Sequence, residues 1–190
     1  SLMYEEGTPL YRMLKEGKVA ECNDDNYIEM YNMLIERLTV SNYEHYEISN
    51  FSKKGYRSRH NSNYWKSVPY LGIGASAHSY NEESRQWNIA NIKEYIESID
   101  NGFIPAEIEK LSISSKFDDT VMTRLRTCEG IDLNYIKQKF GDKYLDFLER
   151  ESSKFIKQQL LKFDKEKNTL SLTKNGIFLS DSIMSDLMYV

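Results

Sequence analysis

Apolar positions near the start of the chain recur with the spacing of helices. Thr8 followed by Pro9 predicts the start of a short helix, because a hydroxyl can cap it and proline suits its first turn, and Gly17 is placed to end it. The Asn-Asp-Asp run at 23–25 offers caps for a longer helix. The apolar face of this second helix is predicted as Tyr27, Met30, Tyr31, Leu34 and Leu38. Residues 1–6 predict a short strand.

Strand-like and helix-like segments go on alternating up to about residue 105. Strand-forming residues dominate 43–51, and very small residues build the strand expected at 69–80. Asn91 is placed to cap a helix that Gly102 ends. The apolar positions of that helix are Ile92, Tyr95, Ile96 and Ile99. This alternation predicts an α/β fold with a parallel sheet and crossover helices.

Helices dominate the pattern after Pro105. A Ser-x-x-Asp pattern at 115–118 predicts the start of a helix, and Gly130 is placed to stop it. The apolar face of this helix is predicted as Phe117, Val121, Leu125 and Cys128. A short helix at 132–140 precedes a long helix that Asp142 opens.

A ribbon and a last helix close the chain. A turn at 164–168 leads into a strand at 169–172, and Thr173 is placed to cap the final helix. The inward positions of that helix are Ile177, Ile183, Met184 and Leu187. Helices followed by a short ribbon and a helix resemble a small winged-helix-type module. The sequence therefore predicts two domains, 1–105 and 106–190.

Composition and charge indicate an ordinary folded protein. The 190 residues are 40% hydrophobic and 28% charged with a net charge of −4, so nothing global favours nucleic acid or an anionic membrane as partner. No apolar run approaches the roughly 20 residues that span a bilayer. The first residues lack a secretory pattern, which indicates a cytoplasmic protein. Because "SLMYEEGTPLY" opens in a strand-like run without a starting methionine, we expect a piece of a longer protein.

Cysteine and histidine do not form a metal-binding pattern. Cys22 and Cys128 are too few and too far apart for a disulfide framework or a zinc site, and are predicted to be buried free thiols. His45, His60 and His78 fall within 34 residues, but no two of them are spaced as ligands on one helix. No metal site is therefore predicted from these residues.

The stretch "SRHNSNYWKS" (58–67) gathers the residue types of a ligand site in a segment without apolar period. It places His60, Asn61, Asn63, Tyr64 and Trp65 just after the cations Lys53, Lys54, Arg57 and Arg59. We predict a ligand-binding loop, because imidazole can ligate haem iron, aromatic faces can stack on a flat macrocycle, and cations can pair with propionates or phosphates. A plain core role for Tyr64 and Trp65 stays open as the alternative.

Nucleic acid and dinucleotides are weaker candidates as ligands. Basic and aromatic side chains also suit single-stranded nucleic acid, but 43–65 carries only four cations beside two glutamates, and 142–190 has eight acidic and eight basic residues. "GIGASA" (72–77) matches a loose dinucleotide-binding pattern, yet no helical face follows it. We expect a barrel strand in which Gly72 and Gly74 let a ligand approach the backbone, with tight strand packing as the alternative.

A longer block resembles a known protein family. "HYEISNFSKKGYRSRHNSNYWKSVPYLGIGASAHSY" (45–80) resembles the central signature of the oxygen-independent coproporphyrinogen III oxidase-like proteins, which are radical S-adenosylmethionine proteins. It is most similar to the branch described as haem chaperones. The H-N-x-x-Y-W motif of the family is filled by His60, Asn61, Tyr64 and Trp65. "EEGTPLYRMLKEGK" (5–18) and "LTKNGIFLSDSI" (172–183) extend the resemblance over essentially the whole chain.

The resemblance implies a fold and a set of cofactors. The fold is the later part of an incomplete radical-SAM β/α barrel, followed by the family's helical C-terminal domain. The C-x-x-x-C-x-x-C motif that holds the family's [4Fe–4S] cluster does not occur in this sequence. The full-length protein is expected to use the cluster and S-adenosylmethionine, and to bind haem, whereas this part alone should hold none of them and be inactive. It should also self-associate, because strands without sheet neighbours leave apolar edges open.

The resemblance leaves three hypotheses for function. The first is an oxidase that oxidatively decarboxylates substrate propionates, the second a non-enzymatic haem chaperone that delivers haem to haem proteins, and the third a winged-helix interaction module. The haem or porphyrin contacts are assigned to Arg57, Arg59, His60, Asn61, Tyr64 and Trp65. The cofactor side of the barrel is assigned to Tyr46, Glu47, Ser49, Asn50, Gly72 and Gly74.

Overall fold

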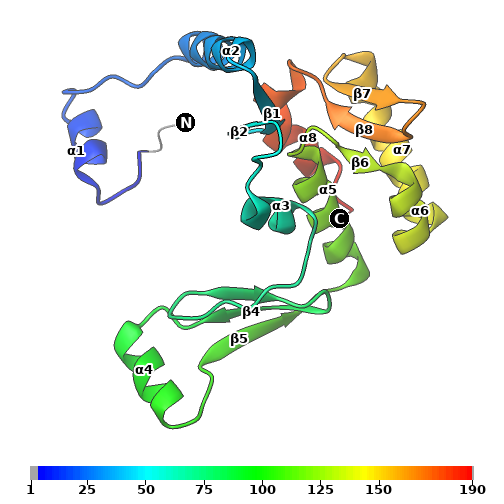
Figure 1. The fold of residues 1–190 in the computed structure, drawn as a ribbon. Coiled ribbons are helices and arrows are strands. Elements are labelled where there is room, and N and C mark those ends of the chain that lie inside the picture. The colour runs from blue at the N-terminus through cyan, green and yellow to red at the C-terminus, as the bar shows by residue number, and fades with distance from the viewer. Residues whose placement is uncertain (1–3, 190) are drawn as a thin grey trace. The chain divides into compact units, whose positions relative to one another are not determined.

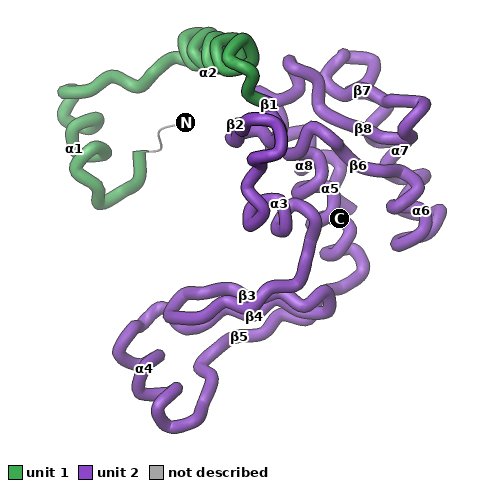
Figure 2. The backbone as a smooth tube through the Cα atoms, in the orientation of Figure 1, with its two compact units in different colours: residues 1–43 green, residues 44–190 purple. Residues whose placement is uncertain are grey.

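The structure, a computed structural model, describes residues 4–189 of the chain (Figure 1). Two compact units divide it, residues 1–43 and residues 44–190 (Figure 2). The strand expected at 1–6 falls partly outside the described residues, and residues 4–6 are not in a strand.

The first unit contains the two helices that the sequence predicts, α1 (Pro9–Lys15) and α2 (Asp24–Val40). The Thr8 side chain accepts a hydrogen bond from the backbone N–H of Tyr11 at 3.2 Å and so caps α1. The Asn23 side chain caps α2 in the same way, at 2.8 Å from the N–H of Asn26. Neither helix has a buried residue, so the apolar face of α2 is correctly placed on a helix but is not part of a core.

The second unit opens with a small sheet and an unpredicted helix. Strands β1 (Tyr43–Glu47) and β2 (Asn50–Lys53) form a two-stranded sheet. Helix α3 (Arg59–Trp65) follows, where the sequence predicted a loop. The expectation of a loop was wrong because Ser58 caps this helix, its hydroxyl accepting from the N–H of Asn61 at 3.2 Å. A helix of seven residues can form from a cap and two turns without a long apolar stripe, so the absence of an apolar period did not exclude it.

The middle segment, residues 69–110, is an antiparallel sheet with one helix. Strands β3 (His78–Tyr80), β4 (Ser84–Asn88) and β5 (Ala106–Lys110) pair in that order, and α4 (Ile92–Asp100) connects the last two. Both pairings are antiparallel, so the parallel sheet with crossovers was a wrong prediction for these strands. The continuous strand expected at 69–80 is also wrong, because positive φ angles at Gly74 (111°) and Ser76 (60°) interrupt it.

The C-terminal part has the winged-helix order that the sequence predicts. Its helices are α5 (Ile113–Leu125), α6 (Leu133–Phe140), α7 (Asp142–Lys157), the 3-10 helix η1 (Gly176–Leu179) and α8 (Ser180–Asp186). Its strands are β6 (Ile131–Asp132), β7 (Leu161–Asp164) and β8 (Thr169–Leu172), antiparallel in the order β6-β8-β7. We call residues 112–189 the winged-helix domain. Its β7–β8 hairpin is the wing.

The winged-helix domain encloses the main core of the chain. Fifteen buried apolar residues form one cluster, with Phe117 and Val121 of α5 and Leu148 of α7 fully buried. Helix α5 begins at Ile113 rather than at the predicted 115, because the Ser112 hydroxyl accepts from the N–H of Ser115 at 3.0 Å. It ends at Leu125, and Cys128 therefore leaves the inner face and is exposed. The prediction of buried thiols is wrong for both cysteines.

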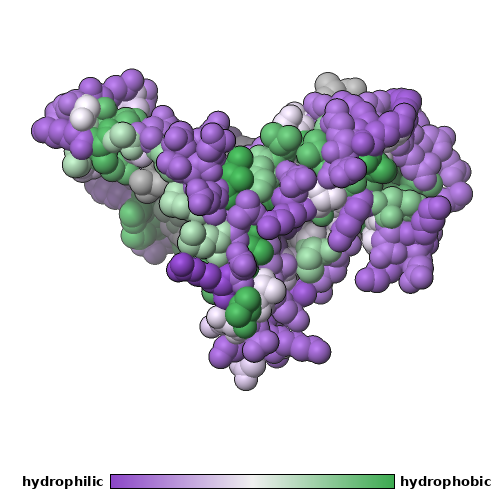
Figure 3. All heavy atoms as spheres, turned by 90° about the horizontal axis from the view of Figure 1, so that it is seen from above, coloured by the Kyte–Doolittle hydropathy of each residue, from purple (hydrophilic) through white to green (hydrophobic). Residues whose placement is uncertain are grey.

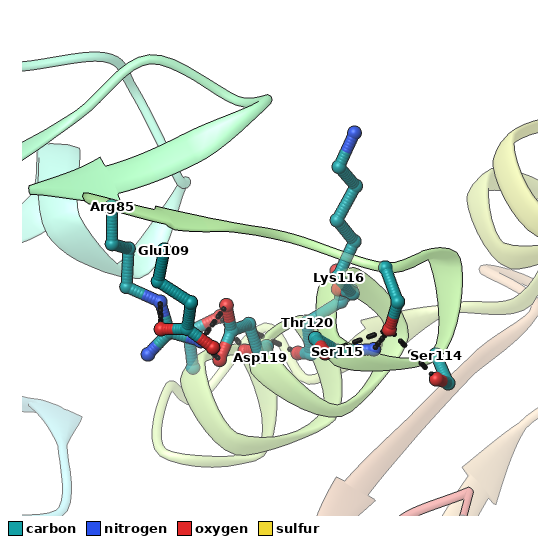
Figure 4. Close-up of polar contacts among 9 residues, drawn as sticks. Arg85, Glu109, Ser114, Ser115, Lys116, Asp119 and Thr120 are labelled. Carbon is teal, nitrogen blue, oxygen red and sulfur yellow. Dashed lines mark hydrogen bonds and ion pairs between the residues drawn. The ribbon is translucent and has the colours of Figure 1, made fainter.

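Backbone and charge contacts join the rest of the second unit to α5. The N–H of Cys128 donates to the carbonyl of Tyr46 at 3.1 Å, and the N–H of Ile48 donates to that of Arg126 at 3.0 Å. The Arg85 side chain of β4 donates to both carboxylate oxygens of Asp119 on α5, at 3.0 and 2.9 Å (Figure 4). The domain boundary predicted near residue 105 stays a prediction. Strand β5, which begins after that boundary, pairs with β4 in the sheet of the middle segment.

Candidate functional site

A cleft of about 430 Å³ lies beside helix α3 and the residues that follow α5. Its lining residues are Tyr46, Arg57, Arg59, Ser62, Asn63, Trp65, Lys66, Arg124, Thr127 and Glu129. Four of these are cations and one is a carboxylate. We call it the cationic cleft. Its walls come from segments that stand some 60 residues apart in the sequence, and the backbone pairing of β1 with 126–128 brings them together.

Arg57 is the cation of the cleft that already has partners. Its guanidinium lies 5.2 Å from the centre of the Tyr46 ring, and its Nε lies 3.2 Å from the carboxylate of Glu44. A second hydrogen bond to Glu129 raises the pKa of Arg57 further. Burial raises the pKa of Glu129, but the hydrogen bonds from Arg57, from its own backbone N–H and from Cys128, together with the charge of Arg57, outweigh burial, and its pKa is lowered. Both groups therefore stay charged at neutral pH.

The other three cations of the cleft have no ion pair among the described residues. Arg59 and Lys66 are exposed at the two ends of α3. Arg124, near the end of α5, lies with its guanidinium 5.5 Å from the centre of the Tyr135 ring. A chain with a net charge of −4 thus keeps a local excess of positive charge at this cleft, which attracts anions.

Trp65 forms part of the cleft and contacts a buried ion pair. The guanidinium of Arg126 lies 5.2 Å from the centre of its ring and bonds to Glu47, whose side chain is fully buried, at 2.8 and 2.9 Å. The indole Nε1 of Trp65 is buried and has no hydrogen-bond partner among the described residues. A buried indole N–H normally finds an acceptor, and this one has none among residues 4–189.

The residues predicted for the cofactor side mostly bind one another. Glu47 accepts from the backbone N–H of Ser49 at 2.9 Å and from the side chain of Asn50, in addition to Arg126. Tyr46 is buried and lines the cationic cleft. This arrangement fixes the turn between β1 and β2 around one carboxylate, and leaves Tyr46 as the residue of this group that faces a cleft.

The two predicted glycines are required for different reasons. A Cβ atom at Gly72 would lie far inside contact distance of the carbonyl oxygen of His78. Gly74 has open space around it but a φ of 111°, which side chains rarely adopt, and its N–H donates to the Tyr95 hydroxyl at 3.1 Å. Neither glycine lines the cationic cleft. The geometry favours the packing alternative at Gly72.

His60 and Tyr64 lie on another face of α3 from Trp65. His60 is exposed, and its ring meets the Tyr64 ring edge-on with centres 4.8 Å apart. The row continues to Tyr70 at 4.7 Å and from there to Tyr80 at 6.2 Å. Tyr70 and Tyr80 line a second, open cleft of about 440 Å³, and burial raises the pKa of both phenols. Helix α3 therefore separates an aromatic row from the cationic cleft.

The structure unites some of the predicted haem contacts and separates others. Arg57, Arg59 and Trp65 line the cationic cleft, whereas His60 and Tyr64 belong to the aromatic row. The half-buried Asn61 donates its backbone N–H to the cap of α3. The cleft residues that the sequence analysis missed are Ser62, Lys66, Arg124, Thr127 and Glu129. The only local signal for Arg124 and Thr127 was the run "RLRT" at the end of a predicted helix, which by itself indicates no site.

The residues present do not fit an iron–sulfur cluster of the family's type. A [4Fe–4S] cluster needs several converging thiolates, and the sequence contains two cysteines, of which Cys22 lies in the first unit and Cys128 in the second. Among residues 4–189, no three His, Cys, Asp or Glu side chains are arranged to hold a metal ion. Nor does any helix in that range have the length and apolarity to cross a membrane.

Comparison with known proteins gives a family match and several relatives. Residues 118–179 match the family model of the HemN C-terminal domain. The chain is 30% identical over 145 residues to the "Heme chaperone HemW" of Bacillus subtilis, covering 76% of this chain and 37% of that protein. It is 29% identical to the protein of the same name from Mycobacterium tuberculosis (strain H37Rv), covering 99% of this chain and 46% of that one. The chain thus spans less than half the length of these relatives.

A solved structure supports the fold. It is that of the coproporphyrinogen III oxidase HemN from Escherichia coli, described as a radical SAM enzyme, and it superimposes with a TM-score of 0.65 at 18% identity, covering 88% of this chain and 42% of that one. This agreement confirms the predicted α/β fold class and the HemN-type C-terminal domain. The chain therefore belongs to the HemN-like family of radical SAM proteins, and its residues 118–179 correspond to the HemN C-terminal domain.

Proposed function

We propose that this chain is the haem-binding part of a haem chaperone-like protein, which holds haem and passes it to haem proteins. One observation carries the proposal: helix α3 has the exposed imidazole of His60 on one face and Trp65 in the cationic cleft on another. Seven residues of helix thus offer an iron ligand, aromatic faces and nearby cations, which are the groups that haem requires. The relatives named "Heme chaperone HemW" support the choice.

Each predicted contact has a role in this proposal. His60 ligates the iron, and its edge-on contact with Tyr64 limits the orientations of the imidazole ring. Tyr64 flanks the macrocycle beside His60, whereas Trp65, Arg57 and Arg59 line the cleft across α3 from it and meet the propionate edge. Asn61 lies beside the imidazole on the same turn. Acceptor proteins would then take haem from an open surface rather than from a closed pocket, because His60 is exposed.

The proposal departs from the expectation that this part alone holds no haem, and it is tested by titrating haem into the chain and following the Soret band. We expect His60→Ala to shift the band and to weaken binding, because the iron loses its protein ligand. His78→Ala is the matched control, since His78 is also exposed and its ring packs on another aromatic residue, Trp87, with centres 6.3 Å apart. An unchanged spectrum and affinity in His60→Ala, with a change in His78→Ala, would move the ligand to His78. Absence of any binding to the unaltered chain would overturn the haem-binding proposal.

A second candidate function is that of the oxidase, favoured by the structural likeness to HemN. In that case the full-length protein would use S-adenosylmethionine and a [4Fe–4S] cluster to decarboxylate substrate propionates, with the cluster held outside the residues present here. The residues proposed for its cofactor side are Tyr46, Glu47, Ser49, Asn50, Gly72 and Gly74. We expect this chain alone, reconstituted with iron and sulfide under anaerobic conditions, to release no 5′-deoxyadenosine from S-adenosylmethionine. Release above background would contradict that expectation.

A further inference from the structure

We infer that the cationic cleft binds a pair of carboxylates carried by one ligand, and that Lys66 and Arg124 determine this specificity. Under the proposed function, on which the identity of the ligand rests, the pair is the two propionates of haem. Neither residue belongs to the H-N-x-x-Y-W motif, and Arg124 belongs to the winged-helix domain. The inference therefore makes that domain part of the ligand site.

The charges of the cleft favour the binding of an anion. Arg57 is neutralised by Glu44 and Glu129, which surround its guanidinium. Arg59, Lys66 and Arg124 face the same space with no carboxylate partner among the described residues. Like charges that share a cleft repel one another unless an anion enters it. Three unpaired cations are enough to pair with two carboxylates, with one cation left over to bind either of them a second time.

The ring of Trp65 forms a fixed wall of the cationic cleft. It is held by Arg126, which is itself fixed by the buried Glu47. The edge of a ligand can lie against this ring while its carboxylates, which accept from arginine and lysine side chains at once, reach the cations of the cleft.

The two proposed residues lie on opposite walls of the cleft. Lys66 follows α3 as its C-cap residue, and Arg124 is in the last turn of α5. The Tyr135 ring, 5.5 Å from the guanidinium of Arg124, limits the positions that this side chain adopts. The cleft of about 430 Å³ is within the size range of ligand sites, and takes the carboxylate-bearing edge of a macrocycle rather than all of it. A ligand bound there would bridge α3 and the winged-helix domain.

The test compares haem with haem dimethyl ester, in which both carboxylates are esterified, on the full 190-residue chain. We expect Arg124→Gln and Lys66→Gln each to weaken haem binding about tenfold, the loss of one charge-assisted hydrogen bond. Both variants should bind the ester as the unaltered chain does. Lys139→Gln is the matched control, because Lys139 also lies over the Tyr135 ring, at 5.4 Å, but does not line the cleft. Circular dichroism checks the fold, and Lys66→Gln, on an exposed residue, keeps the test informative if Arg124→Gln unfolds.

The outcomes separate this inference from the proposed function. If haem binds but Arg124→Gln and Lys66→Gln behave like Lys139→Gln, or if the ester binds as tightly as haem, the carboxylate site is overturned and haem binding stands. Inorganic pyrophosphate is the probe for a phosphate ligand. If the chain binds pyrophosphate through Arg124 and Lys66 but not haem, the proposed function and the carboxylate pair are both overturned in favour of a phosphorylated ligand. Binding of neither overturns both proposals.

Discussion

The winged-helix domain and the middle segment differ in how they bury apolar side chains. Phe117, Val121 and Leu148 of the winged-helix domain are fully buried. On α4, by contrast, Ile92, Ile96 and Ile99 are 69%, 52% and 43% exposed. Apolar residues of this kind give the green areas of the molecular surface in Figure 3. Both regions contain helices and strands, so the difference in burial shows that regular elements form here without a core. Of the two, the winged-helix domain has the burial expected of an independently stable unit.

The difference in burial is tested most directly by truncating one apolar side chain in each region. We expect Leu148→Ala to lower the free energy of unfolding by about 3–5 kcal/mol, because it leaves a cavity in a fully buried position. Ile96→Ala, the matched change on α4, should cost less than about 0.5 kcal/mol. Denaturant unfolding followed by circular dichroism measures both. Equal losses would mean that the middle segment has a core of its own.

A second change tests the attachment of β1 and α3 to the winged-helix domain. Arg126→Met leaves the fully buried Glu47 without its cation, which should cost about 2–3 kcal/mol. Trp65 fluorescence in a Trp87→Phe background reports on this region, because Arg126 lies against the Trp65 ring. Arg150→Met is the control, since Arg150 is 69% exposed in its pair with Glu151 and should matter little. The prediction is contradicted if, in Arg126→Met, the Trp65 fluorescence changes in the same transition as the winged-helix domain and the free energy of unfolding equals that of the unaltered chain.

The exposed face of α4 predicts self-association of the chain. Apolar surface left open in this way favours contact between copies, as expected from the sequence for strands and edges without neighbours. We expect oligomers by light scattering at high concentration, and a dissociation constant about tenfold higher for Ile96→Glu, because a buried isoleucine would be worth ~1.5 kcal/mol at such an interface. Val40→Glu changes an equally apolar exposed residue of α2 and serves as the control. A monomer at all concentrations would rule the interface out.

The smallest expected effect concerns acid. Because the folded chain lowers the pKa of Glu129 below its usual value of 4.5, the unfolded chain takes up this proton first as the pH falls. The stability that Glu129 contributes is therefore complete above about pH 5 and is lost as the pH drops through the lowered value. Glu129 is 59% exposed, so we expect less than about 1 kcal/mol, or roughly 2–4 °C in melting temperature. Glu129→Gln should melt lower than the unaltered chain at pH 7, and the difference should shrink as the pH falls below 4.5. A constant difference would refute the assignment.

The fold was predictable where local signals agreed with one another. In the winged-helix domain, caps, helical spacing and turn residues indicated the same elements, and α6, α7 and the wing occur where predicted. Helix α3 was missed because its residues are polar and its only start signal is Ser58. The segment 69–80 was taken for one strand because small residues fit a strand as well as they fit positive φ angles.

The candidate site was predictable only on the side that is contiguous in sequence. Arg57, Arg59 and Trp65 occur in one stretch and line the cleft together. Arg124 and Thr127 reach the same cleft through backbone bonds between β1 and residues 126–128. No local pattern encodes that pairing, because it depends on a bridge between segments about 80 residues apart. The resemblance to a family identified the motif on α3, whereas the residues from α5 that line the same cleft could be identified only from the structure.

Helix α5 carries two attachments at a fixed spacing. Asp119 holds Arg85 of the middle segment (Figure 4), and Arg124 lines the cationic cleft five residues later. At 1.5 Å per residue the two positions are about 7.5 Å apart along a rigid rod. A shift of α5 along its axis must therefore move both by the same amount. A ligand in the cleft that displaced α5 would therefore carry the Arg85 contact of β4 with it.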